Sequence, residues 1–242
     1  MTYNEDSLIE KLSVIKDSLE NCNFELYSEN DVDIWNAIES SGAYTNENAT
    51  YRTGASKFCI IPKETDYVIK IPFNSLLEEE YWDNDDDESS YEKFLDPLDD
   101  YCDIEAYNYK IAKEQYPGAE MFLAETKFLY SGFNICFYIQ EKATVFNELD
   151  GEWDKRKEVS KSYKTKNENS KIDDVIYESC YDDLPPVWLR KLLEYGLSHN
   201  VMENVNQFIN FLAEYQINDL YGNNLGFIGD KPVLFDYSGW EG

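Results

Sequence analysis

The sequence predicts an α+β fold with two lobes, in which a small antiparallel sheet with one helix is followed by a reduced helical half. Apolar alternations typical of short strands lie between residues 56 and 139, and helical apolar spacing returns after residue 186. The 242 residues, 43% of them hydrophobic and 16% aromatic, are enough for one large domain or for two small lobes around a shared core. We expect a helical extension over residues 1–39 and lobes over residues 40–143 and 144–242.

Two helices are expected in the N-terminal extension. Apolar residues recur at helical spacing over Ser7–Leu19, and Ser7 with Glu10 forms a capping box at the start. A second, shorter helix is expected over Asp31–Glu39, where two serines and a glycine then break the pattern. Both helices precede the strands of the first lobe.

Two hairpins and a helix are expected in the first lobe. The strand-like segments are Ser56–Pro62, Tyr67–Phe73, Glu125–Tyr130 and Asn134–Ile139. The first two flank a polar four-residue turn, Lys63–Asp66. A helix is expected between the hairpins, over Pro97–Gln115, and its apolar stripe is Ile104, Tyr107 and Ile111.

The second lobe is expected to be mainly helical. One helix follows Pro186 and reaches Tyr195, and another covers Glu203–Tyr215. A loop over Gln216–Asn224 then leads to a short hairpin that ends at Asp236. We expect the two lobes to meet near Tyr138–Thr144.

The net charge narrows the classes of partner. There are 49 acidic and 21 basic residues, a formal charge of −28. Nucleic acids and anionic membranes are bound through Lys and Arg, so we expect neither as a partner. Between Leu76 and Glu105 there are fourteen acidic residues and one base, most simply a solvated face. Lys155–Lys171 is the basic exception, with seven bases and two acids, and is expected to be an exposed connection.

Cysteine and histidine usage excludes several chemistries. The five cysteines form no Cys-x-x-Cys pair, so neither a disulfide scaffold nor a zinc site is expected. The single histidine, His199, leaves no second histidine for multi-His metal chemistry, and we expect it at a surface or helix end. No signal-peptide pattern and no apolar stretch of membrane-spanning length occurs, so we expect a cytoplasmic protein.

A group of polar residues fits phosphoryl transfer. Asp219 and Asn224 lie in the loop before the last hairpin, and Asp236 closes its second strand. That chemistry uses an acid to orient the attacking hydroxyl, and a carboxylate with an amide to hold Mg²⁺ on ATP. Lys70 lies inside an apolar strand, where an ammonium group needs a partner, and Glu105 on the next helix is a candidate.

In this order, these residues resemble the protein-kinase-like superfamily, especially its small bacterial and bacteriophage-encoded members. The resemblance implies an ATP- and Mg²⁺-dependent phosphotransferase of two-lobed protein-kinase-like fold. It makes Lys70 the lysine that binds phosphates and Glu105 the helix glutamate that pairs with it. Asp219 takes the catalytic place, with Asn224 and Asp236 as metal ligands.

The resemblance also implies where the rest of the nucleotide binds. Tyr138–Ala143 is similar to the hinge, where backbone groups of Glu141 and Ala143 would meet adenine. Thr53, Gly54 and Ser56 stand where a glycine-rich loop is expected, but this loop has one glycine instead of three. Six residues follow Asp236 in the sequence, so we expect no activation segment and no peptide-binding helices.

Other interpretations of these residues stay open. Lys70 could be an ordinary strand lysine, the segment from Asp219 to Asn224 a plain turn, and Asp236 a strand end. A second functional hypothesis is a catalytically inert kinase-like protein, encoded by a phage or mobile element and acting in the host cytoplasm. Its acidic surface would bind and inhibit a basic host or defence protein.

Overall fold

The computed structural model describes residues 3–22, 26, 28–54, 56–73, 101–132, 135–146, 186–217, 220 and 222–238. These form a mixed α+β structure, as the sequence predicts. The chain divides into two compact units, Met1–Ala106 with Thr126–Glu141, and Tyr107–Glu125 with Lys142–Gly242. One boundary, between Glu141 and Lys142, falls within the predicted hinge segment. The division into residues 1–39, 40–143 and 144–242 stays a prediction.

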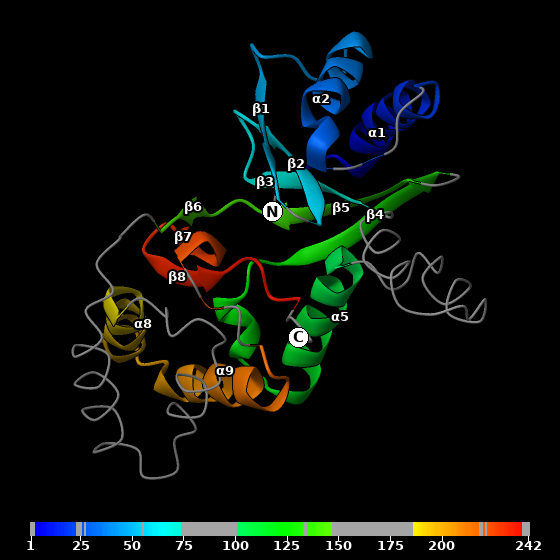
Figure 1. The fold of residues 1–242 in the computed structure, drawn as a ribbon. Helices are drawn as coiled ribbons and strands as arrows, with labels where there is room; N and C mark the ends of the chain where they lie inside the picture. The colour runs from blue at the N-terminus through cyan, green and yellow to red at the C-terminus, as the bar shows by residue number, and fades with distance from the viewer. Residues whose placement is uncertain are drawn as a thin grey trace, which may run out of the picture. The chain divides into compact units, whose positions relative to one another are not determined.

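The first unit contains a five-stranded antiparallel sheet of order β1-β2-β3-β5-β4 (Figure 1). The strands are β1 (Ala49–Thr53), β2 (Lys57–Pro62), β3 (Tyr67–Pro72), β4 (Thr126–Gly132) and β5 (Ile135–Glu141). Both predicted hairpins are confirmed, as β2–β3 and β4–β5. The edge strand β1 was missed, because Ala49 alone among its residues is buried and no alternation results.

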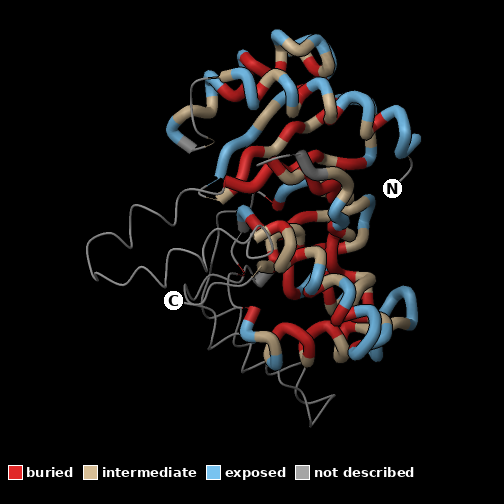
Figure 2. The backbone as a smooth tube through the Cα atoms, turned by 90° about the vertical axis from the view of Figure 1, so that its right-hand side faces the viewer, coloured by how far each residue is buried: buried red, intermediate tan, exposed pale blue. Residues whose placement is uncertain are grey.

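Two helices cover one face of this sheet. They are α1 (Glu5–Glu20) and α2 (Asp31–Ser40), drawn in blue on the same side of the strands in Figure 1. Their buried residues share a core with apolar side chains at alternate positions of the strands. The helices contribute Leu12, Ile15, Ile34 and Ile38, and the strands contribute Phe58, Ile60, Ile69, Ile71, Phe137 and Ile139. In Figure 2, which colours the backbone by burial, red marks the buried residues.

Both predicted N-terminal helices are confirmed, but the capping box is wrong. The N-cap of α1 is Asn4, whose side chain accepts a hydrogen bond from the Ser7 backbone nitrogen at 3.0 Å. Asparagine caps as well as serine does, and this start adds Glu5 and Asp6 to the first turn. Acidic residues there interact favourably with the helix dipole, so the helix begins earlier than the apolar spacing indicates.

The opposite face of the sheet carries polar side chains. Successive strand residues point to opposite faces, and the register places Cys59 opposite Lys70, and Lys70 opposite Tyr138. Lys57 and Gln140 lie two residues from Cys59 and Tyr138 and therefore share their face. One sheet thus has an apolar face under α1 and α2 and a face that gathers two lysines.

Helix α5 (Tyr101–Gln115) confirms the predicted helix, whose first four positions lie outside the described residues. The predicted apolar stripe is wrong in part, because Tyr107 is 56% exposed and Ile104 is only half-buried. The buried positions are Cys102, Glu105, Asn108, Ile111 and Ala112. Two of these are polar, so a search for apolar periodicity places the buried face about one residue out of phase.

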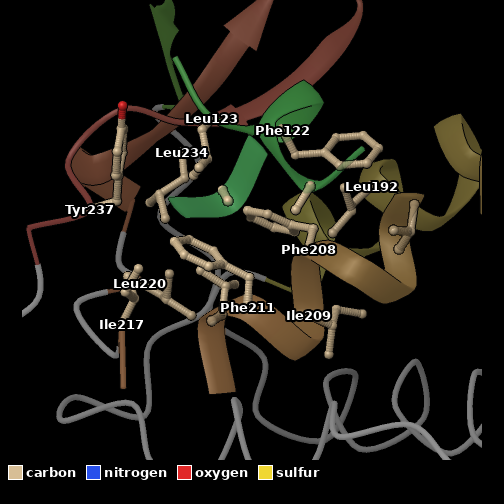
Figure 3. Close-up of a cluster of buried hydrophobic side chains, with 14 of the residues drawn as sticks. Phe122, Leu123, Leu192, Phe208, Ile209, Phe211, Ile217, Leu220, Leu234 and Tyr237 are labelled. Carbon is tan, nitrogen blue, oxygen red and sulfur yellow. The ribbon is translucent and has the colours of Figure 1, made fainter. Parts of the chain in front are cut away.

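The second unit combines helices with a three-stranded sheet of order β6-β7-β8. Its elements are α8 (Pro186–Ser198), α9 (Met202–Glu214), β6 (Thr144–Val145), β7 (Leu225–Ile228), β8 (Lys231–Leu234) and short turns of 3-10 helix, Ala119–Phe122 and Gly222–Asn224. The two predicted helices and the last hairpin are confirmed; the two-residue strand β6 was missed. Figure 3 shows the aromatic core, in which Phe208 of α9 lies 5.5 Å from Phe122 between ring centroids.

Some predicted features lie outside the described residues. These are Asp219, most of the acidic run Leu76–Glu105, and the whole basic segment Lys155–Lys171. His199 is described and is exposed directly after α8, as expected. Within the described part of the chain, no helix combines the length and the hydrophobicity needed to cross a bilayer.

Candidate functional site

Glu105 of α5 is the centre of a buried polar cluster in the first unit. Its carboxylate is fully buried, and the oxygen Oε1 accepts a hydrogen bond from Lys57 Nζ at 2.6 Å. The other oxygen, Oε2, accepts one from Lys70 Nζ, also at 2.6 Å. Lys57 comes from β2 and Lys70 from β3, so two neighbouring strands hold the same residue of the helix.

Two neutral side chains complete what we call the Glu105 cluster (Lys57, Lys70, Glu105, Thr126 and Gln140). Thr126 and Gln140 face each other across β4 and β5. Gln140 Nε2 donates to Thr126 Oγ1 at 2.7 Å and to Glu105 Oε2 at 3.2 Å. Thr126 Oγ1 donates to Glu105 Oε2 at 3.3 Å. Hydrogen bonds from four strands therefore fix the position of one carboxylate.

Burial makes these interactions important for the stability of the first unit. The side chains of Lys57, Lys70 and Glu105 are 7%, 4% and 0% exposed. Charges buried this far are tolerated when they are paired and hydrogen-bonded, and removing one partner is costly. The predicted ion pair between Lys70 and Glu105 is confirmed, and Lys70 is not an ordinary exposed strand lysine.

Sequence reasoning missed Lys57, Thr126 and Gln140 of this cluster, although a signal for Lys57 was available. The signal was present in the predicted turn, Lys63–Asp66, which leaves Pro62 opposite Tyr67. Counting back from that pair brings Cys59 opposite Lys70, as the register shows. Lys57 then lies on the face of Lys70, because strand residues two apart share a face.

The predicted metal ligands lie together in the second unit, at the open end of the hairpin β7–β8. Leu225 pairs with Leu234, and the Phe235 backbone nitrogen donates to the Asn224 carbonyl at 2.9 Å. Asn224 therefore lies beside Phe235, next to Asp236. Asn224 is buried and Asp236 is half-buried. We call Asn224 and Asp236 the hairpin site.

Backbone contacts hold the segment after Asp236 in place. The Tyr237 side chain is fully buried, and its hydroxyl donates to the Ala124 carbonyl at 2.6 Å. The Tyr237 carbonyl accepts a hydrogen bond from Asn108 Nδ2 of α5 at 2.9 Å. On β7, the Gly226 carbonyl accepts one from the Trp188 indole at 3.3 Å. The backbone carrying Asp236 is thus attached to its unit on both sides of the hairpin.

The hairpin site has the donor types that Mg²⁺ prefers. One carboxylate and one amide oxygen match an ion that takes few protein ligands and completes its shell with water and phosphate oxygens. Ser238 Oγ donates to Asp236 Oδ1 at 3.4 Å. Among the described residues, no group of three or more His, Cys, Asp or Glu side chains could hold a metal ion alone.

The remaining predicted site residues are at the ends of strands. Thr53 ends β1 and Gly54 follows it, where the Gly54 nitrogen donates to the Lys57 carbonyl at 3.0 Å and closes a turn. Ser56 precedes β2 and is half-buried. Glu141 ends β5 in the first unit, and Ala143 precedes β6 in the second; both are half-buried. The position of Asp219 is outside the described residues.

No protein-family model, curated protein or solved structure matches this chain.

Proposed function

We propose that the protein is an ATP- and Mg²⁺-dependent phosphotransferase of protein-kinase-like fold. The proposal assigns no particular phosphate acceptor. The observation that carries the proposal is the buried pair of Lys70 and Glu105, with 2.6 Å between Nζ and Oε2. In protein kinases a lysine of the third strand binds the nucleotide phosphates and pairs with a glutamate of the following helix. Lys70 lies on β3, and Glu105 lies on α5, which is the next described element.

The proposal gives each charged residue one task. Lys70 donates hydrogen bonds to phosphate oxygens, and Glu105 holds its ammonium group at the required place. Asp219 accepts a hydrogen bond from the acceptor hydroxyl and orients it for attack. Asn224 and Asp236 would hold Mg²⁺, which, when bound, neutralises charge on the transferred phosphoryl group.

The nucleotide base and outer phosphates are assigned to neutral groups. Backbone groups of Glu141 and Ala143 would pair with the adenine edge. The turn at Thr53, Gly54 and Ser56 would lie over the phosphates, although a turn with one glycine offers fewer close backbone nitrogens than a glycine-rich loop. These assignments make the triphosphate, more than the base, the main source of binding energy.

A titration with Mg-ATP, read by thermal stability, tests the proposal. A ligand that binds only the folded protein at a hundredfold excess over its Kd adds about 2.7 kcal/mol of stability. We expect stabilisation of that order for the wild type, and its loss in Asp236→Ala and Asn224→Ala. Asp230→Ala, an exposed acid in the turn of the same hairpin, is the matched control.

The alternative function predicts a different result. The charge of −28 favours a binding protein directed at a basic partner, because exposed acids speed encounter with such a surface. That protein would show no Mg-ATP stabilisation, and neutralising Asp83, Asp85, Asp86, Asp87 and Glu88 would weaken its complex. Wild-type stability unchanged by Mg-ATP would reject the phosphotransferase and leave this alternative.

A further inference from the structure

We propose that Lys57 is a second phosphate-binding lysine, so that the ligand of the Glu105 cluster is a nucleoside di- or triphosphate. The inference rests on the proposed function and deepens it. The sequence resemblance singles out Lys70 alone, whereas the geometry gives Lys57 an equal claim. Each lysine places Nζ at 2.6 Å from one oxygen of the same carboxylate.

The two lysines share three properties that bear on phosphate binding. They lie on neighbouring strands of one sheet and point to the same face. Both side chains are nearly buried, at 7% and 4% exposure. Both are held by Glu105, and under the proposed function this residue orients the phosphate-binding lysine, as a helix glutamate does in protein kinases. A phosphate brought to one ammonium group is therefore brought close to the other.

Two ammonium groups gathered at one carboxylate match a polyanionic ligand. Each lysine contacts a different oxygen of Glu105, so the two Nζ atoms lie close together. An ammonium group carries three donors, so each lysine can also donate to a different phosphate group.

The number of phosphates in the ligand separates this role from a structural one. A lysine that contacts phosphate contributes to the binding of ATP and ADP, and it contributes nothing to adenosine. Substituting a lysine that only supports the fold of the cluster would weaken the binding of adenosine as strongly as the binding of ATP. AMP, with one phosphate, can contact one of the two lysines. The loss of AMP affinity in the variants should therefore fall between these extremes.

The experiment is calorimetric titration of ATP, ADP, AMP and adenosine, each with Mg²⁺, into the wild type and three variants. Lys57→Met and Lys70→Met remove each ammonium group and keep the length of the side chain. Lys127→Met, an exposed lysine on β4 beside Thr126, is the matched control. We expect each cluster variant to bind ATP and ADP about tenfold more weakly, as for loss of one charge-assisted hydrogen bond. Adenosine affinity should stay unchanged.

Failure of this inference and failure of the proposed function give different results. If the wild type binds no nucleotide, both are rejected. If Lys70→Met loses ATP while Lys57→Met binds it as Lys127→Met does, the second lysine is rejected and the phosphotransferase stands. An equal loss for ATP and adenosine in Lys57→Met likewise rejects the phosphate contact.

A measurement on the wild-type protein covers the case in which Lys57→Met does not fold. The amines are acylated with an N-hydroxysuccinimide ester and the modified lysines are identified by mass spectrometry. We expect ATP, but not adenosine, to slow modification of both Lys57 and Lys70. Modification of Lys57 at the same rate with either ligand would overturn the proposal.

Discussion

The Glu105 cluster and the hairpin site both contain buried polar side chains, but the surroundings of the two sites are held together in different ways. In the cluster, side chains bond to side chains, and charge is the organising interaction. Around the hairpin, side chains bond to the backbone, as Asn108, Trp188 and Tyr237 do. The first region should therefore be sensitive to changes of charge, and the second to changes in how closely the chain segments approach.

The largest expected effect is in the cluster, with Glu105→Ala. The change leaves Lys57 and Lys70 buried without the carboxylate that both of them contact. Removing one partner of a buried ion pair costs about 3–5 kcal/mol in the free energy of unfolding. Urea denaturation followed by circular dichroism measures the loss, and hydrogen exchange should show it in β2 and β3.

Glu114→Ala provides the control on the same helix, because Glu114 is exposed and should change stability by less than about 0.5 kcal/mol. A loss below about 1 kcal/mol in Glu105→Ala would mean that charge does not organise the cluster. The contrast between the two regions would then disappear.

An intermediate effect is expected in the hairpin region, with Gly226→Ala. A Cβ at this position would lie 2.5 Å from the Thr144 carbonyl oxygen, so strands β6 and β7 would have to separate. Overpacking of this kind costs about 1–3 kcal/mol. Hydrogen exchange at β6 and β7 locates the change, and thermal denaturation gives its size.

Gly54→Ala is the matched substitution in the first unit. Its Cβ would meet the Lys57 carbonyl oxygen at 3.8 Å, which is an ordinary contact, so the thermal midpoint should stay within about 2 °C of the wild type. Equal destabilisation by both substitutions would show that close backbone approach is not special to the hairpin region.

The smallest expected effect is that of Tyr237→Phe. The change removes one hydroxyl that donates to the Ala124 carbonyl at 2.6 Å and preserves the ring in the core. Loss of such a hydrogen bond costs about 1 kcal/mol. Equilibrium denaturation measures it, and a loss as large as that of Glu105→Ala would contradict the assignment of the stronger interactions to charge.

Elements with a clear period could be predicted from the sequence. Strands β2 to β5 alternate between an apolar and a polar face, and α9 presents a regular apolar stripe ending in Phe211 and Leu212. Strand β1 has one buried residue and β6 has two exposed ones, so neither produces a period. Their positions are decided by pairing with a neighbour, which no local pattern records.

A residue of the candidate site could be predicted where the residues next to it in the sequence gave a signal. Lys70 could be identified because an apolar strand surrounds it, and Glu105 on the next predicted helix was a candidate for the partner that a buried ammonium group needs. Lys57 begins its strand beside polar residues, so its burial depends on the register and not on its neighbours. Asn108 was missed for a similar reason, since a polar residue on a buried helix face has no apolar signal.

The packing of α1 and α2 on the sheet has a consequence for synthesis of the chain. Leu12 and Ile15 share a core with Phe137 and Ile139, which leave the ribosome long after them. At about 5–20 residues per second, the apolar side of α1 waits on the order of ten seconds for the strands that cover it. During that interval the nascent chain exposes the apolar side of α1. A holding chaperone that binds apolar helices would recognise it before the native sheet has formed.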